Sequence, residues 1–270
     1  MIGTSLPAIP RPASTILLLR DGPTGLETFM VVRHHQIDFA SGALVFPGGR
    51  MEAADEAVAA LGSRSKDGRF AGRPMGRGAI DPEPVDPLAS FKAAAIREAF
   101  EECGLLLACA EEEGALVPAA RVAALDRAAP FADLLIREGL IPALDRLVHF
   151  AHWITPDFVP KRFDTHFFLA LAPEDQALAH DGREAVDSVW ISPRAALAEH
   201  GKRYKLLFPT YRNLWKLSAF SDAASALAAA RETPVVTVLP EKTTVDGEPG
   251  LKIPAEAGYG GESFSVVGLI

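Results

Sequence analysis

Three glutamates on one short predicted helix could bind a metal ion together. The segment 96–107 reads IREAFEECGLLL, and its acids are Glu98, Glu101 and Glu102. At about 100° per residue they fall within roughly a third of the helix circumference. An i,i+4 pair of like charges destabilises an exposed helix by roughly 0.2–0.5 kcal/mol. The opposite face is apolar, which indicates a docked helix, so we expect a cation from outside the chain to balance the acids.

The flanking residues predict where this helix begins and ends. Asp86 can act as N-cap, with a proline at the first helical position, and Gly104 is a natural residue just past the last turn. The sequence therefore predicts a catalytic helix over about residues 87–103. Arg97 is one turn before Glu101, close enough to orient that carboxylate.

Strand and helix patterns are interspersed along the rest of the chain, which predicts an α/β or α+β protein with a mixed sheet. Runs of apolar, aromatic and β-branched residues predict the strands. The expected strands are 14–19, 28–32, 43–46, 161–173, 186–191 and 234–240. Helices are expected where Ser192 can cap the segment that follows it, and in two segments after residue 205.

Composition divides the chain into one large domain and a tail. Residues 1–235 are expected to form the domain, with an insertion loop at 56–90 and extra helices at 115–150. The insertion is rich in Gly, Pro and Arg, which indicates a solvated loop; a basic flap over an anionic ligand is the alternative. Residues 236–270 are expected to form a strand followed by an irregular tail.

The overall charge limits the possible partners and location. A net charge of −8 and a pI near 5.4 argue against binding to nucleic acid or to an anionic membrane. The chain has two cysteines, and no Cys/His set has zinc spacing. Its amino terminus lacks the pattern of a signal peptide, and it ends in Gly-Leu-Ile without a peroxisomal Ser-Lys-Leu. We therefore expect the cytoplasm.

Two segments together resemble the Nudix box. They are FPGGR at 46–50 with Asp55 following, and REAFEECGL at 97–105. The family pattern has a glycine, five residues, an acid, seven residues, and then this second half. Here Asp55 stands where Glu is usual, and residues 56–96 replace the seven. A surface insertion adds little closure entropy, so the two halves can still meet in space. The resemblance implies a Nudix-type α/β/α sandwich with a mixed sheet and a long insertion inside the box.

The resemblance also implies the chemistry of the site. Its cofactor would be Mg²⁺, with Mn²⁺ as an alternative, since hard carboxylate oxygens suit these ions. Glu98 and Glu102 would be the principal ligands, with Glu101 and the Gly48 carbonyl completing the set. The enzyme would hydrolyse a diphosphate linkage. The residues assigned to catalysis are Glu101, Arg97 and a distal candidate base, Glu184.

The segments around the box are similar to the branch of Nudix hydrolases that contains the peroxisomal coenzyme A diphosphatase. These segments are VVRHHQIDFASGALVFPGG, WITP and RFDTHFF. That branch implies cleavage of CoA or acyl-CoA to 3′,5′-ADP and (acyl-)phosphopantetheine. Basic residues could meet the substrate phosphates; the candidates are Arg33, Arg50, Lys161 and Arg162. The alternatives are hydrolysis of ADP-ribose, a nucleotide sugar or a dinucleoside polyphosphate, and a non-catalytic nucleotide-binding module. The sequence leaves open whether the protein forms a homodimer.

Overall fold

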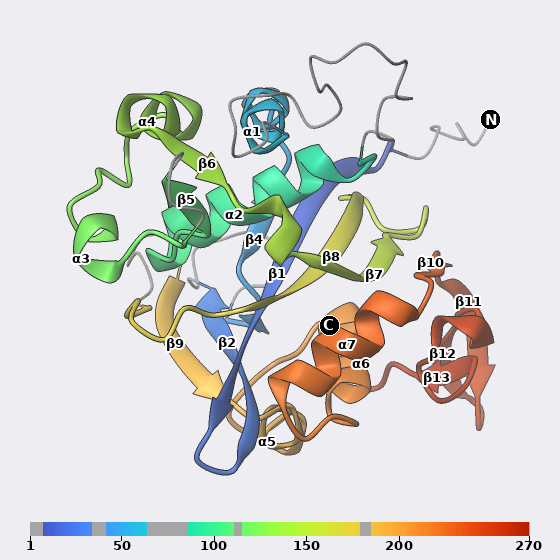
Figure 1. Ribbon diagram of the computed structural model, residues 1–270. Coiled ribbons are helices and arrows are strands. Elements are labelled where there is room, and N and C mark those ends of the chain that lie inside the picture. Colours follow the sequence, from blue (N-terminus) through green and yellow to red (C-terminus); the bar gives the residue numbers. More distant parts are fainter. Residues whose placement is uncertain (1–7, 34–41, 64–85, 111–114, 179–184, 270) are drawn as a thin grey trace.

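A mixed β-sheet lies between two layers of helices (Figure 1). The computed structural model describes residues 8–33, 42–63, 86–110, 115–178 and 185–269. In this part of the chain the main sheet has eight strands in the order β10-β7-β8-β1-β2-β3, with β4 paired to β1 and β9 to β2. The strands are β1 Arg11–Gly22, β2 Gly25–Arg33, β3 Leu44–Val45, β4 Gly48–Arg50, β7 Val148–Ile154, β8 Phe163–Leu171, β9 Ala185–Ile191 and β10 Thr237–Val238.

Each face of the sheet has its own hydrophobic core. On β1, Ile16 and Leu18 pack into one core while Leu17 and Leu19 pack into the other, which explains the continuous apolar run. One core contains residues of α1 Ala54–Gly62, α2 Ala89–Cys103, α3 Ala119–Val122 and α4 Phe131–Glu138. The other contains residues of α5 Pro193–Ala198, α6 Phe208–Leu217 and α7 Ala223–Glu232. The expected α/β/α sandwich is confirmed.

The glutamate-bearing helix α2 begins at Ala89 rather than at residue 87. The N-cap position is Leu88 and not Asp86 as expected, although the Asp86 carboxylate accepts the Leu88 N–H at 2.9 Å and the Asp86 carbonyl accepts the Ala89 N–H. At the other end Gly104 adopts the left-handed conformation, with φ 72°. Gly104 therefore terminates α2 as the sequence predicts.

The expected insertion and extra helices contain more regular structure than their composition indicates. The insertion starts inside α1, and residues 64–85 lie outside the described part of the chain. Residues 115–150 hold α3, α4 and a 3₁₀ turn at Leu144–Arg146, as expected, but β6 Leu140–Pro142 also pairs with β5 Ala108–Ala110. Strand β7, which the sequence did not predict, pairs with β8 and extends the main sheet.

The carboxyl-terminal segment corrects the expectation of an irregular tail. After β10, the strands β11 Glu241–Val245, β12 Glu248–Lys252 and β13 Ser263–Ser265 form a three-stranded antiparallel sheet, and a 3₁₀ turn spans Ala255–Ala257. Asp246 and Gly247 both have positive φ and make the tight β11–β12 turn that Asp-Gly favours. Tyr259 is buried in the α6–α7 core, so the segment is packed onto the domain.

No helix among the described residues combines the length and apolar character needed to span a bilayer.

Candidate active site

The Gly-Gly turn lies directly against the glutamates of α2. Strand β4 pairs with β1, which fixes Gly48 and Gly49 beside the helix. The Gly48 N–H donates to Glu102 Oε2 at 3.0 Å. A Cβ on Gly49 would lie 2.6 Å from the Glu98 carboxylate carbon, and a Cβ on Gly48 would lie 2.7 Å from Thr15 Cα. Glycine is therefore required at Gly48, where the close atoms belong to the backbone of β1, whereas a side chain at Gly49 would displace the carboxylate of Glu98.

Arg97 joins the glutamates to the first half of the motif through a set of hydrogen bonds. Its Nη1 donates to Glu98 Oε1 at 2.9 Å and to Glu101 Oε2 at 3.0 Å. Its Nη2 donates to the Arg50 carbonyl at 2.9 Å. Nε and Nη2 together bind the two oxygens of Asp55 at 2.8 and 3.1 Å. All five N–H groups of the guanidinium have acceptors, so the side chain is held in one orientation.

Asp55 is the residue that connects the two halves of the motif. It lies in the first turn of α1, is fully buried, and pairs with Arg97 across 42 residues of chain. The same carboxylate accepts the Glu52 N–H at 2.8 Å and so stabilises the start of α1. The acid of the pattern is thus an internal counter-charge, and the two halves meet despite the insertion between them.

The charges in this cluster oppose the effect of burial. Burial by itself lowers the pKa of Arg97, but the hydrogen bond to Asp55 and the negative charges of Glu98, Asp55 and Glu101 raise it well above its ordinary value. Burial raises the pKa of Glu101, and Arg97 only partly opposes this. The sequence analysis missed Glu52, whose charge also raises the pKa of Glu101. Glu52 lies three residues before Asp55 in the first half of the motif, and this position in the sequence could have identified it as part of the acidic cluster.

The donor set fits a hard divalent cation. Glu98, Glu101 and Glu102 come from one face of α2, and the side chains of Glu98 and Glu101 are 13% and 36% exposed. Glu98 lies against the Gly49 backbone so closely that a Cβ would fill the space. Grouped carboxylate oxygens beside a backbone turn are the chemistry that Mg²⁺ prefers. Ligation by the Gly48 carbonyl stays a prediction.

The structure separates the candidate substrate-binding residues. Arg50 is exposed and adjoins Gly49 on β4. Arg162 donates to the carbonyls of Thr155 and Ala8 at 2.9 and 2.8 Å, and so holds the start of β8. Lys161 is exposed beside it, and Arg33 ends β2. Contact of these residues with substrate stays a prediction. The candidate base Glu184 lies outside the described residues.

Comparisons with known proteins agree with the geometry of the site. A model of the NUDT19 Nudix domain matches residues 10–214. The acyl-coenzyme A diphosphatase NUDT19 of Gallus gallus is 31% identical over 243 residues, which cover 74% of this chain and 63% of the relative. Its counterpart in Xenopus laevis is 24% identical over 222 residues, which cover 68% and 57%. The chain thus spans less than two thirds of the length of these relatives.

A solved structure shares the fold. The Nudix hydrolase from Alicyclobacillus acidocaldarius superposes with a TM-score of 0.65 at 26% identity, covering 82% of this chain and 96% of that one. The family model spans most of the chain, and the described residues bring the two halves of the motif together around Arg97. The protein therefore belongs to the NUDT19 family of Nudix hydrolases.

Proposed function

We propose that this protein hydrolyses the diphosphate linkage of CoA or acyl-CoA in the presence of Mg²⁺, giving 3′,5′-ADP and (acyl-)phosphopantetheine. The observation that carries the proposal is the set of three glutamates fixed by Arg97 and the Gly-Gly turn. The names of the Gallus and Xenopus relatives support the choice of substrate.

The residues of the site divide into metal ligands and residues that position them. Glu98, Glu102 and Glu101 would hold the cation, together with the Gly48 carbonyl. When bound, Mg²⁺ neutralises the phosphate oxygens and favours attack by water. Arg97 acts through Glu98 and Glu101, since it contacts both and is itself buried.

Hydrolysis requires a group that accepts the proton of the attacking water. Water adds its oxygen to one phosphorus, the bridging P–O bond breaks, and the second phosphate departs with that oxygen. Glu101 is a candidate base because its carboxylate is partly exposed and oriented by Arg97. Glu184 is the alternative, from a segment outside the described residues.

The substrate presents a diphosphate, a 3′-phosphate and an adenine. Arg50 is well placed for a phosphate because it follows the Gly-Gly turn and its side chain is exposed. Arg33, Lys161 and Arg162 are further candidates for the 3′-phosphate. Arginine suits this role because its planar fork matches phosphate oxygens.

The test is a substrate panel with resolved products. The protein is incubated with CoA, acyl-CoA, ADP-ribose and a dinucleoside tetraphosphate plus Mg²⁺ in ¹⁸O-water, and products are identified by mass spectrometry. We expect 3′,5′-ADP and phosphopantetheine, with ¹⁸O in one of them, and no turnover after chelation. Cleavage of ADP-ribose alone would replace the CoA assignment. Binding of nucleotide without cleavage of any substrate would indicate a non-catalytic module.

A matched pair of variants tests the metal ligands. In Glu102→Gln the amide oxygen can still accept the Gly48 N–H, so the fold is kept while the charge is lost. Turnover should fall more than about 100-fold, because even outer partners of metal ligands change activity 10–100-fold. Glu56→Gln removes an exposed acid of α1 and should leave turnover unchanged.

A further inference from the structure

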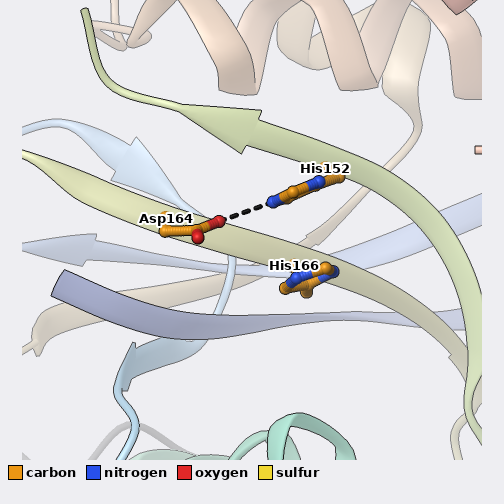
Figure 2. A group of neighbouring side chains, drawn as sticks. All are labelled: His152, Asp164 and His166. Atoms are coloured by element: carbon orange, nitrogen blue, oxygen red, sulfur yellow. Dashed lines mark hydrogen bonds and ion pairs between the residues drawn. The ribbon is translucent and has the colours of Figure 1, made fainter. Parts of the chain in front are cut away.

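A group of three histidines and one aspartate lies on the α2 side of the main sheet, apart from the glutamates. His152 is opposite His166 in the β7–β8 pair, Asp164 is two residue pairs along, and His149 is near the other end of β7. Phe168 and Ala170 belong to the core on the α2 side, and alternation along β8 directs Asp164 and His166 to the same side. Figure 2 shows His152 directed at Asp164, with His166 beside it.

The side chains are close enough to share one ion. His152, Asp164 and His166 each offer a ligand atom, and these atoms all lie within 4.8 Å of one another. His152 Nε2 is 2.5 Å from Asp164 Oδ1, and the rings of His152 and His166 stack with their centroids 4.0 Å apart. Since the rings are nearly parallel, binding one ion to both requires them to tilt. Asp164, whose side chain is 34% exposed, gives solvent access to the group.

Outer partners fix the ring nitrogens. His152 Nδ1 is 2.8 Å from Thr237 Oγ1 on β10, which leaves Nε2 on the Asp164 side. His166 Nδ1 is 3.0 Å from His149 Nε2, so Nε2 is the nitrogen that can turn to an ion. Histidines that bind metals characteristically engage their second nitrogen in such a bond.

This group is separate from the glutamate site. His166 on β8 is in register with Ser14 on β1, and Ser14 is in register with Gly49 on β4. Two strand spacings therefore separate His166 from Gly49, about 10 Å. The ligand types also differ, because imidazole suits zinc-like ions whereas grouped carboxylates suit Mg²⁺.

We propose that His152, Asp164 and His166 form a second metal site, which binds a Zn²⁺-class ion through two imidazoles and one carboxylate. The ion replaces the proton shared by His152 and Asp164, and a solvent molecule completes a four-coordinate shell. Thr237 and His149 orient the two imidazoles. The ion thereby joins β7 to β8, next to the amino-terminal end of α2, where Phe91 contacts the His166 ring.

The test is zinc binding by the full chain with Mg²⁺ in excess, measured by competition with a chromogenic chelator. We expect one tightly bound zinc per chain, and affinities at least about 100-fold weaker in His152→Gln, Asp164→Asn and His166→Gln. Co²⁺ should give the visible absorption of a tetrahedral site in the wild type and lose it in these variants. His200→Gln, outside the group, and Glu102→Gln, in the other site, should bind zinc like the wild type.

Thr237→Val guards against a trivial loss of fold, since it keeps all three ligands. We expect it to keep its circular dichroism spectrum and to weaken zinc about 10-fold. Absence of zinc binding by the wild type overturns the proposal. So does zinc binding that survives His166→Gln and Asp164→Asn, or that disappears in Glu102→Gln, because the ion would then occupy the glutamates.

Discussion

Arg97 and Asp55 form a buried ion pair in which each charge compensates the other. The guanidinium side chain is 6% exposed and the carboxylate 0%. Removing charged groups from water is unfavourable, and here it is offset because Arg97 has acceptors for all its N–H groups. The pair therefore contributes most by holding the site in one geometry, and breaking it on one side leaves a buried charge poorly compensated.

Asp55→Asn tests how much the charge of Asp55 compensates that of Arg97. The amide keeps one acceptor oxygen, but its NH₂ group then faces a guanidinium N–H, donor against donor. We expect the free energy of unfolding to fall by about 3 kcal/mol, measured by urea denaturation, with turnover reduced as Arg97 releases Glu98 and Glu101. Glu138→Gln, which breaks the exposed pair with Arg137, should change the free energy of unfolding by less than about 1 kcal/mol. Equal effects in the two variants would contradict this account.

At the scale of elements, helix α2 depends on the extra helices for its last turn. Arg127, in the segment between α3 and α4, donates through Nε to the Phe100 carbonyl at 3.0 Å and through Nη2 to the Glu101 carbonyl at 2.5 Å. A cation at a helix carboxyl terminus satisfies its unpaired carbonyls and its dipole. Arg127 thus stabilises the turn that carries Glu101 and Glu102.

Arg127→Met should loosen that turn without changing the glutamates. Methionine fills a similar volume but donates no hydrogen bond, so we expect a loss of about 2 kcal/mol in unfolding free energy and lower turnover with CoA. Thermal unfolding and steady-state kinetics measure the two effects. Arg137→Met, at an exposed position of α4, is the matched control and should leave both unchanged. An unaltered Arg127→Met enzyme would show that α2 does not need this cap.

Helix α7 begins at a carboxylate whose charge links stability to pH. Asp222 accepts the Ser225 N–H at 2.7 Å and the Ser221 hydroxyl at 2.8 Å. These bonds lower the pKa of Asp222 below its ordinary value. A lowered folded-state pKa means that the stabilisation is complete above the unfolded pKa of about 3.9 and is lost as pH falls through the folded value.

Asp222→Asn keeps the cap and removes the charge. The variant should unfold at a lower temperature than the wild type at pH 7, and the difference should shrink below about pH 4. Thermal unfolding of both proteins across this range measures it. A difference that stays constant with pH would mean that the charge of Asp222 does not stabilise α7.

The features that the sequence predicted are mainly local. The end of α2 follows from Gly104, and the glutamates share a face because of helical periodicity, whereas the expected start was wrong because α2 begins at Ala89 with Leu88 at the N-cap position. The histidine group was missed because its members meet only through the register of β7 with β8, which spacing along the chain does not show. The last strands were missed because Gly and Pro masked the Asp-Gly hairpin around Gly247.

At the scale of the whole molecule, the carboxyl-terminal segment closes the second core. Tyr259 accepts the Trp153 indole N–H at 3.0 Å and donates to Asn213 Oδ1 at 2.7 Å. It thereby connects strand β7, helix α6 and the segment between β12 and β13 through one buried hydroxyl. The boundary expected at residue 235 therefore separates parts that share a core, and we predict that the domain needs its tail to be stable.

Tyr259→Phe tests this connection because it removes only the hydroxyl group. Its loss leaves the Trp153 N–H and the Asn213 oxygen buried without this partner, so we expect about 2 kcal/mol lower unfolding free energy. Tyr204→Phe is the matched control: that side chain is also buried, and within the described residues its hydroxyl has no hydrogen-bond partner. The control should be neutral or slightly more stable in urea denaturation. If Tyr204→Phe is the more damaging change, burial of the rings rather than the Trp153–Tyr259–Asn213 chain holds the tail in place.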